Sequence, residues 1–237
     1  MVTKSQKKVC IVIPAYNESA VIGSVVSEII KALSTTPYLW SVLVVNDKSK
    51  DNTAQIAQKN GAIVVNHILN SGAGGATATG LSYADQNGFD VAATMDADGQ
   101  HDSDDVVKGI GELIKSQSDL MIGSRLIDSK GMSRVKVLGN KGLSFVTLVL
   151  FGIRSTDSQS GLRIFSRKAL NQLTWKSSGY EFASEMLWRA RQKKLIIDEF
   201  PIKAIYTDYS KSKGQSNWNA INIIKSLLKQ RLVEMFE

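Results

Sequence analysis

The chain has 237 residues, of which 43% are hydrophobic, so it is long enough and apolar enough to bury a substantial core. It contains only three prolines and no stretch rich in Ser and Gly, which argues against a flexible linker, and we expect one domain (residues 1–210) with a C-terminal extension (residues 211–237). Lys and Arg outnumber Asp and Glu by 29 to 22, and the resulting charge of +7 suits phosphate-bearing molecules, anionic membranes, nucleic acids or a merely solvated surface.

The sequence also argues against a disulfide, a signal peptide and a membrane span. Its single cysteine, Cys10, cannot form an internal disulfide, which fits a reducing compartment. The polar N-terminus is followed by no long apolar segment before Pro14, so no signal peptide is expected. The longest apolar stretch, Leu143 to Ile153, is far shorter than the ~20 residues that span a bilayer.

The first half of the chain alternates between two hydrophobic patterns. Continuous apolar runs predict five buried strands, at Val9 to Ile13, Val42 to Val45, Ala62 to Val65, Val91 to Met95 and Leu120 to Ile122. Helical segments separate them, at Asn17 to Leu33 with Asn17 as the predicted N-cap, Asp51 to Lys59, Ala73 to Gln86 and Ser103 to Lys115. This alternation predicts an α/β fold with a single, mostly parallel, doubly wound sheet flanked by helices.

The second half is less regular. We expect an apolar helix near Leu143 to Leu150, a strand near Leu162 to Phe165, helices near Ala169 and Phe182, and a β segment from Leu195 to Ile205. A C-terminal helix is predicted from Asn219, with Ile221, Ile224, Leu228, Leu232 and Met235 on one face and Lys225 and Lys229 away from it. Such a basic amphipathic helix fits a membrane interface, and the same stripe also fits a helix that packs on the domain.

Acidic side chains follow the fourth predicted strand. Ligands of open α/β sheets bind beyond the carboxyl ends of the strands, so Asp96 and Asp98 are expected to face a crevice there. Two carboxylates one residue apart can hold Mg²⁺ or Mn²⁺ against a diphosphate, because these cations prefer oxygen ligands. The alternative is an acidic solvated loop.

The segment from Asn70 to Ala76 is rich in glycine and opens a helix. It is not a dinucleotide-binding fingerprint, because the sixth position counted from Gly72 is Thr77 and the segment follows the third strand. Two interpretations remain: backbone N–H groups that contact a donor phosphate, or small residues that allow close packing of the helix.

Taken together and in order, the motifs resemble those of glycosyltransferase family 2. They are Pro14 to Glu18 after the first strand, Asn46 to Thr53 after the second, Asn70 to Ala76, Asp96 to Asp102, Gly123 to Arg125, Asp157 to Phe165 and Gly179 to Glu181. Within the family they resemble the dolichol-phosphate mannose synthase and polyprenyl-phosphate glycosyltransferase group, over about residues 8 to 216. The resemblance implies a GT-A fold.

The resemblance also implies roles for individual residues. Pro14, Tyr16, Glu18, Asp47, Gly72 and Asp96 are expected to bind the nucleotide sugar, and Asp96, Asp98 and Gln100 to hold the metal. Arg125, Arg134, Asn140 and Arg163 are candidates for the acceptor phosphate, although Arg163 fits a bracing role equally well. Asp98, Arg125 and Asp157 are the predicted catalytic residues, with Asp157 near the reacting sugar.

Two positions depart from the family pattern. Lys48 stands where a glycine is usual, at the rim of the crevice, where it either binds phosphate or points into solvent. Lys211 stands where an arginine is expected, and lysine keeps the charge but lacks the bidentate guanidinium fork.

These features predict an inverting, metal-dependent hexosyltransferase. The donor would be a UDP- or GDP-linked sugar and the acceptor a polyprenyl or dolichyl phosphate, whose oxygen is already an anionic nucleophile. The alternative is a family 2 enzyme acting on a soluble or polysaccharide hydroxyl, which needs a carboxylate base, and Asp157 is the candidate for it. By resemblance we expect a peripheral protein at the cytoplasmic face of a membrane, with a small membrane-protein partner possible.

Two further classes fit poorly. A sugar-1-phosphate nucleotidyltransferase would carry a glycine-rich basic loop after the first strand, and Pro14 to Glu18 is not one. A nucleic-acid-binding domain would have clustered aromatics within its basic segments and leaves Asp96 and Asp98 unexplained, so no nucleic acid partner is expected.

Overall fold

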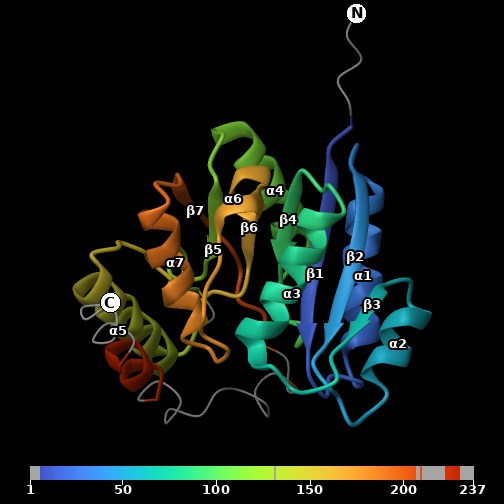
Figure 1. The fold of residues 1–237 in the computed structure, drawn as a ribbon, viewed down its shortest axis with the longest axis horizontal. Helices are drawn as coiled ribbons and strands as arrows, with labels where there is room; N and C mark the ends of the chain where they lie inside the picture. The colour runs from blue at the N-terminus through green and yellow to red at the C-terminus, as the bar shows by residue number, and fades with distance from the viewer. Residues whose placement is uncertain (1–5, 131, 207–208, 210–221, 230–237) are drawn as a thin grey trace, which may run out of the picture.

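The computed structural model describes residues 6–130, 132–206, 209 and 222–229 (Figure 1). Its strands are β1 (Lys8–Ala15), β2 (Leu39–Asn46), β3 (Ile63–Asn66), β4 (Val91–Thr94), β5 (Leu120–Ser124), β6 (Arg163–Ser166) and β7 (Ile197–Pro201). Its helices are α1 (Ile22–Ser34), α2 (Thr53–Lys59), α3 (Gly72–Gln86), α4 (Ser103–Ser116), α5 (Arg134–Phe151), α6 (Arg167–Gln172) and α7 (Phe182–Gln192), and residues 222–229 are also helical.

One seven-stranded sheet runs through the molecule in the order β3-β2-β1-β4-β6-β5-β7. The pairs β1–β2, β2–β3, β1–β4 and β5–β7 are parallel, whereas β6 runs antiparallel to both β4 and β5. The prediction of a single, mostly parallel sheet flanked by helices is therefore confirmed. The insertion of β6 between β4 and β5 brings the loop that precedes Arg163 beside the loop that follows β4.

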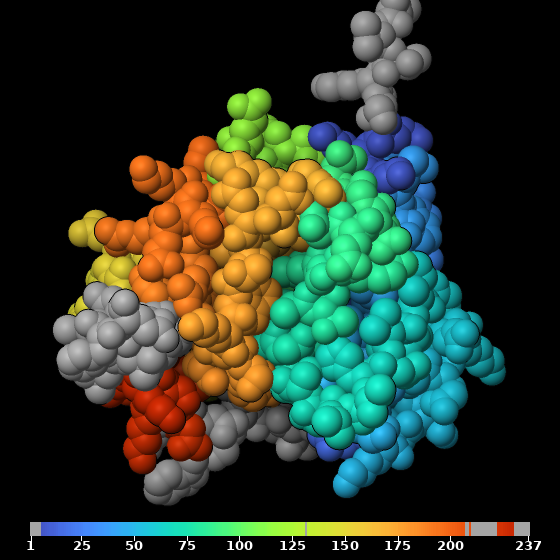
Figure 2. All heavy atoms as spheres, in the orientation of Figure 1, coloured from blue at the N-terminus to red at the C-terminus, as the bar shows by residue number. Residues whose placement is uncertain are grey.

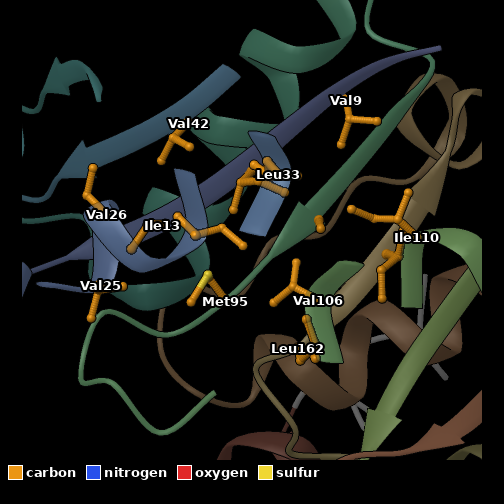
Figure 3. Close-up of a cluster of buried hydrophobic side chains, with 14 of the residues drawn as sticks. Val9, Ile13, Val25, Val26, Leu33, Val42, Met95, Val106, Ile110 and Leu162 are labelled. Carbon is orange, nitrogen blue, oxygen red and sulfur yellow. The ribbon is translucent and has the colours of Figure 1, made fainter. Parts of the chain in front are cut away.

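Helices cover both faces of the sheet, with α3, α6 and α7 on the face seen in Figure 2, and the core is divided accordingly. Val9, Ile11 and Ile13 of β1 pack toward α1 and α4, in the cluster seen in Figure 3, while Cys10 and Val12 pack toward the opposite face. Side chains alternate between the two faces of a strand, so a strand that is covered on both sides reads as one continuous apolar run. Burial raises the pKa of the Cys10 thiol to about 12, so Cys10 behaves as a small hydrophobe.

Helix α1 begins later than predicted, and Asn17 is not its N-cap. The helix starts at Ile22, after a turn in which the N–H groups of Val21 and Ile22 donate to the carbonyl of Glu18. Asn17 has a positive φ of 56°, a conformation that asparagine tolerates better than most residues. Its side-chain oxygen accepts a hydrogen bond from the backbone N–H of Lys50 at 2.7 Å. Asn17 therefore joins the loops that follow β1 and β2.

Helix α5 is much longer than the predicted helix near Leu143 to Leu150, and it begins at Arg134. The side-chain oxygen of Ser133 accepts from the N–H of Lys136, and Gly152, with φ of 68°, ends the helix. Residues 134–142 hold no buried apolar side chain, so the hydrophobic pattern marked only the second half of the helix. No helix in the described part of the chain is long and apolar enough to span a bilayer.

Of the predicted C-terminal helix, the structure describes residues 222–229. Ile223 and Leu227 are buried in the core cluster that includes α7, while Leu228 is exposed. For these two turns the packing interpretation is favoured over the membrane interpretation, although the predicted stripe held Ile224 and Leu228. Ile221, Leu232, Met235, Lys211 and most of the predicted extension 211–237 lie outside the described residues.

Candidate active site

A cavity of about 720 Å³ opens at the carboxyl edge of the parallel strands. Loops that follow β1, β2 and β4 line one part of it, and α5, the 159–161 segment and Tyr206 line the other. A crevice at this edge is where open α/β sheets bind their ligands. Of the predicted site residues, those that line it are Pro14, Tyr16, Glu18, Asp47, Gly72, Asp96, Asp98, Gln100, Arg125, Asn140 and Arg163.

Alternate residues after β2 hold the loop after β1 in place. The N–H groups of Asn17, Glu18 and Ser19 donate to the side chains of Ser49, Thr53 and Asp51, at 2.9, 2.8 and 3.1 Å respectively. Burial opposes ionisation of Asp51, but hydrogen bonds from Thr53 and Ser19 outweigh it and lower the pKa to about 2. The spacing Ser-x-Asp-x-Thr thus positions the segment from Pro14 to Glu18 on the cavity wall.

The carboxylate of Asp47 binds the backbone at the N-terminus of α3. Its carboxylate accepts from the N–H groups of Ser71 at 2.7 Å and Gly72 at 2.8 Å, and it contacts Nδ1 of His67 at 2.8 Å. Burial disfavours the charge of Asp47, but these hydrogen bonds outweigh burial and hold its pKa below the usual value. Most of the carboxylate is therefore engaged within the protein, although Asp47 also lines the cavity.

The glycines at the start of α3 allow a second loop to pack closely. The N–H of Gly74 donates to the carbonyl of Ser178 at 2.7 Å. A Cβ atom added to Gly72 would lie 2.4 Å from that same carbonyl oxygen, and one added to Gly74 would lie 2.4 Å from the carbonyl oxygen of Ser177. Because the N–H groups of Ser71, Gly72 and Gly74 already have partners, close packing is favoured over phosphate contact at these groups.

The acidic motif after β4 reaches the cavity from its floor. The carboxylates of Asp96 and Asp98 both line it, and the side chain of Gln100 donates to Asp98. His101 is buried, and its Nε2 lies 3.1 Å from Oδ2 of Asp96. Gly161 lies directly against Asp96, since an added Cβ would be 2.3 Å from its carboxylate oxygens. Any larger residue at position 161 would displace Asp96.

The two carboxylates have pKa values that differ in direction. The pKa of Asp98 is raised by burial and by the negative charge of Asp96. Burial also opposes ionisation of Asp96, but the hydrogen bond and charge of His101, followed by Arg125 and Arg163, outweigh it and hold the pKa of Asp96 below its usual value. A divalent cation would relieve this repulsion between like charges.

The donor set fits Mg²⁺ or Mn²⁺. Within the described residues no group of three or more His, Cys, Asp and Glu side chains is arranged to hold a metal ion without help. Mg²⁺ in particular is usually bound through one or two carboxylates, with water and substrate phosphates completing its shell. Asp96 and Asp98, with the amide oxygen of Gln100, supply such a partial shell beside the cavity.

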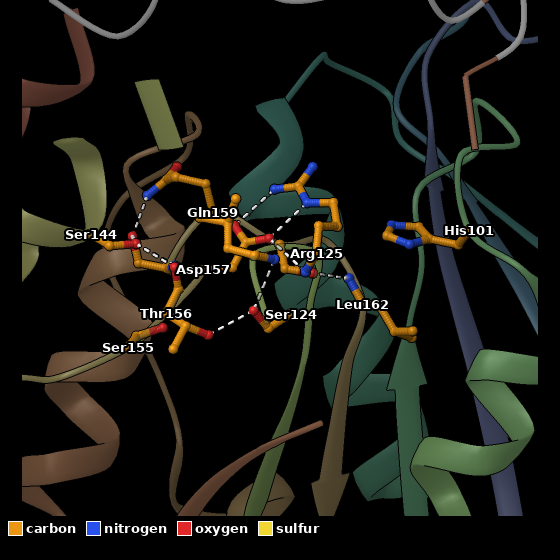
Figure 4. A network of polar contacts seen from close by, with 12 residues as sticks. His101, Ser124, Arg125, Ser144, Ser155, Thr156, Asp157, Gln159 and Leu162 are labelled. Atoms are coloured by element: carbon orange, nitrogen blue, oxygen red, sulfur yellow. Dashed lines mark hydrogen bonds and ion pairs between the residues drawn. The ribbon is translucent and has the colours of Figure 1, made fainter. Parts of the chain in front are cut away.

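Arg125 projects into the cavity from the end of β5, held from behind by Asp157. Its Nε and Nη2 donate to the two oxygens of Asp157 at 2.7 and 2.9 Å, as Figure 4 shows, and its backbone N–H donates to the same carboxylate at 3.1 Å. Burial disfavours the charge of Arg125, but Asp157 outweighs it and raises the pKa of the guanidinium further. Such bidentate pairs fix the orientation of the arginine.

Asp157 lies behind Arg125 and not on the cavity wall, and its predicted place near the reacting sugar stays a prediction. Its side chain is 0% exposed and does not line the cavity, because Arg125 covers it. The neighbouring Thr156 contacts Ser124 at 2.6 Å, as Figure 4 shows. It also donates to Glu199 at 2.5 Å. Asp157 is therefore a positioning residue for Arg125.

Of the other predicted basic residues, Arg163 is placed as a brace and Arg134 lies away from the cavity. Arg163 is buried, donates from Nη2 to the carbonyl of Ser158 at 2.8 Å, and stacks 5.6 Å from the ring centroid of Phe182. Burial lowers its pKa to about 10, so it remains charged at neutral pH. Its Nε is buried and has no hydrogen-bond partner among the described residues. Arg134 is exposed and does not line the cavity.

The sequence motifs assigned no role to Lys136, Gln159, Tyr180 or Tyr206, all of which line the cavity, although Gln159 and Tyr180 lie within quoted motifs. The Nζ of Lys136 lies 4.1 Å from the ring centroid of Tyr206, which places this cation on the same wall as Asn140. Predicting α5 at its full length would have placed Lys136 beside Asn140, because Lys136, Asn140 and Leu143 recur at three- and four-residue spacing on one helix face. Lys48 is exposed and does not line the cavity.

Comparison with known proteins identifies the family of the chain. The family model described as glycosyl transferase family 2 matches residues 10–174. The chain is 38% identical over 255 residues to the UDP-N-acetylglucosamine–dolichyl-phosphate N-acetylglucosaminyltransferase of Methanococcus voltae, covering 98% of this chain and 100% of that protein. It is 25% identical to the polyprenol monophosphomannose synthase of Mycolicibacterium smegmatis, over 94% of this chain and 85% of that protein.

Solved structures share the fold. Mannosyl-3-phosphoglycerate synthase from Rubrobacter xylanophilus superposes with a TM-score of 0.70 at 18% identity, over 94% of this chain and 74% of that one. Glucosyl-3-phosphoglycerate synthase from Mycobacterium tuberculosis, in complex with Mn²⁺, UDP-glucose and phosphoglyceric acid, gives a TM-score of 0.67 at 21% identity, over 93% of this chain and 79% of that one. At this level of identity the likeness supports the fold alone.

Proposed function

The chain belongs to glycosyltransferase family 2, and from this premise we propose that it moves a sugar from a nucleotide-diphosphate sugar to the phosphate of a polyprenyl or dolichyl lipid, with inversion at the anomeric carbon. One observation carries the proposal: a single cavity joins a pair of carboxylates, Asp96 and Asp98, to a pair of cations, Arg125 and Lys136. The carboxylate end suits a metal-linked diphosphate, and the cationic end suits a second phosphate, that of the acceptor.

The geometry of Asp157 argues against its acting as the base for a hydroxyl acceptor. A hydroxyl nucleophile needs a general base within hydrogen-bond reach of its proton. Asp157, the candidate for that role, is fully buried and already bound at both oxygens by Arg125. A phosphate monoester is already an anion near neutral pH, so it needs orientation and not deprotonation. The site is equipped for orientation.

The proposed reaction is a direct displacement. An oxygen of the lipid phosphate, held by Arg125 and Lys136, forms a bond to the anomeric carbon from the face opposite the nucleotide. The bond from that carbon to the nucleoside diphosphate breaks, and its electron pair leaves with the diphosphate. Asp96, Asp98 and Gln100 would hold Mg²⁺ or Mn²⁺, which would neutralise the charge that builds on the departing diphosphate. Alignment and electrostatics then supply most of the rate.

We further propose that α5 holds the enzyme at the surface of a membrane, on its cytoplasmic face. Val135, Leu138, Phe145 and Val149 are 64–74% exposed along this helix, which contains Arg134, Lys136 and Lys141 but no Asp or Glu. A basic helix with an exposed apolar face is suited to an anionic headgroup layer. Val135 also lines the cavity, so the same helix joins the bilayer to the acceptor end of the site. A small membrane-protein partner and the extension 211–237 as an additional interface element stay predictions.

The test is a transfer assay with purified protein, Mn²⁺ or Mg²⁺, radiolabelled UDP- and GDP-sugars and polyprenyl phosphate in detergent. We expect label to enter the organic phase only when metal and lipid phosphate are both present, and not with Asp98→Ala. Release of nucleotide without labelled lipid would move the acceptor to water or to a soluble hydroxyl and contradict the proposal. The donor that supports labelling identifies both the sugar and the nucleotide.

A further inference from the structure

A second apolar surface lies on the opposite rim of the cavity, in the loop between β3 and α3 (residues 67–71). At its tip Ile68 and Leu69 are 83% and 78% exposed, the highest values among the large hydrophobic side chains that the structure describes as exposed. Their neighbours on both sides are fixed: His67 contacts Asp47, and Asn70 donates from Nδ2 to the carbonyl of Asp47 at 3.0 Å. Two aliphatic side chains are thus held in water by an anchored loop, an arrangement that folding alone does not favour.

We propose that Ile68 and Leu69 form a second membrane-docking point, which inserts into an anionic bilayer together with α5. The inference rests on the proposed function, since a lipid-borne acceptor requires the cavity mouth to meet the bilayer. Asn70, next to Leu69, and Val135 of α5 both line the cavity, so apolar surface flanks the cavity on two sides. A bilayer is the partner that would contact both rims at once.

The charges around the loop favour an anionic lipid surface. Lys48 and Lys50 are exposed in the neighbouring loop, which is tied to residues 67–71 through Asp47. Residues 52–84 contain no Asp or Glu. The carboxylate of Asp47 is buried, and that of Asp51, next to Lys50, accepts from the N–H groups of Ser19 and Thr53. Cations beside an apolar tip attract anionic headgroups, each contributing modestly. An acidic protein surface would satisfy Lys48 and Lys50 but gives no reason for a matching apolar surface on α5.

Two contact points determine orientation where one does not. In the sheet order, β3 is the first strand and β5, which leads to α5, is the sixth, as Figure 1 shows. Five strand spacings of about 4.8 Å separate them by roughly 24 Å. Docking through α5 alone would leave the protein free to tilt about that helix. A second contact on the far rim would hold the cavity mouth against the headgroups, where a lipid phosphate is found.

The first experiment compares two double variants in vesicle sedimentation. Ile68→Asn/Leu69→Asn removes the apolar tip without adding charge. Leu39→Asn/Ile196→Asn makes the same change in two exposed residues at the opposite, amino edge of the sheet. With vesicles of phosphatidylcholine and phosphatidylglycerol, we expect the partition coefficient to fall by about tenfold or more in the first variant and to stay unchanged in the second. Equal partitioning of the first variant and the wild type would overturn the proposal.

A second measurement reports insertion directly. Because Cys10 is buried, an environment-sensitive thiol dye should label Leu69→Cys selectively. We expect the emission of this dye to shift to the blue when vesicles are added, whereas Leu39→Cys, labelled in the same way, keeps its emission. An unshifted dye at position 69, or a shift that follows self-association in the absence of vesicles, would contradict membrane insertion of the loop.

The outcomes separate this inference from the proposed function. Transfer to a short, water-soluble polyprenyl phosphate should be unchanged in Ile68→Asn/Leu69→Asn, because the substituted side chains lie outside the cavity lining. A loss of that transfer would assign the loop to the cavity and refute docking. If no lipid phosphate is glycosylated while vesicle binding still depends on Ile68 and Leu69, then docking is supported and the proposed function fails. If the wild-type protein glycosylates a lipid phosphate but does not bind vesicles, then the proposed function is supported and docking is refuted.

Discussion

Asp157 influences the cavity through Arg125, since both of its oxygens are committed to that guanidinium and none faces the cavity. In Asp157→Asn the arginine keeps its charge but loses the carboxylate that fixes it. We expect the KM for the lipid phosphate to rise by about 10- to 100-fold while the KM for the donor changes little, because charge-assisted hydrogen bonds contribute about 1.5–3 kcal/mol. Steady-state kinetics with each substrate varied in turn measures the two KM values.

The pH profile of this variant separates positioning from general-base catalysis. If Asp157 were a base, Asp157→Asn would remove an acidic limb from the plot of kcat against pH and leave the acceptor KM alone. If it positions Arg125, the shape of the profile should persist. Breaking this largely buried ion pair should also lower the free energy of unfolding by about 3 kcal/mol, which a urea titration would show.

The structure and the sequence motifs point to different basic residues of α5 for the acceptor site, namely Lys136 and Arg134. It lines the cavity beside Tyr206, whereas Arg134, two residues earlier on α5, is exposed and outside it. We expect Lys136→Ala to raise the KM for the lipid phosphate by about tenfold and Arg134→Ala to leave it within twofold in detergent, where membrane attraction plays no part. Equal effects of the two substitutions would mean that the helix contributes only general positive charge.

At the scale of elements, close contact between α3 and the loop at residues 177–180 shapes the donor side of the cavity. Gly74→Ala places a Cβ atom 2.4 Å from the carbonyl oxygen of Ser177, and Gly179 and Tyr180 of the displaced loop line the cavity. We expect this substitution to destabilise the fold by about 1–3 kcal/mol and to raise the donor KM. Gly111→Ala in α4 is the matched control, since no atom lies within 4 Å of its added Cβ and alanine favours the helix.

The elements that sequence predicts well are those whose signal is local. A strand buried on both faces is a continuous apolar run, so β1, β2, β4 and β5 could be located to within a few residues. The start of α5 could not, because residues 134–142 include no buried side chain and so carry no buried stripe. The place of β6 in the sheet is likewise decided by pairing with strands about 40 and 70 residues earlier, which a local pattern does not encode.

The same distinction holds for the site. Motifs at strand ends predict which residues reach the cavity, and Asp96, Asp98 and Arg125 lie there. What a motif does not reveal is the partner of each side chain. The carboxylate of Asp157 and the guanidinium of Arg125 are 32 residues apart in sequence, and only the fold shows that they bind one another. For the same reason the engagement of Asp47 with the start of α3 was not predicted.

At the scale of the whole molecule, Asp119 joins segments that are distant in sequence. It is buried, and its carboxylate accepts from Lys168 Nζ at 2.8 Å, the N–H of Ile196 at 2.9 Å and Ser166 Oγ at 3.3 Å. Burial disfavours its charge, but these partners outweigh burial and hold its pKa below the usual value. The ends of β5, β6 and β7 are thereby tied together at the edge of the sheet opposite the cavity.

The stability that Asp119 supplies should depend on pH with a definite sign. Because its folded pKa is lower than the unfolded value of about 3.9, the stabilisation is complete above that value and is lost as the pH falls through the folded pKa. We expect Asp119→Asn to lower the free energy of unfolding by about 1–3 kcal/mol at pH 7, and the difference from wild type to shrink below about pH 4. Urea titrations at pH 7, 5 and 3 measure this difference.

Asp128→Asn is the control, since its contact with Lys130 at 3.7 Å is exposed and should contribute less than about 1 kcal/mol at any pH. If the difference in unfolding free energy for Asp119→Asn is as large at pH 3 as at pH 7, then the negative charge of Asp119 is not the source of the stabilisation.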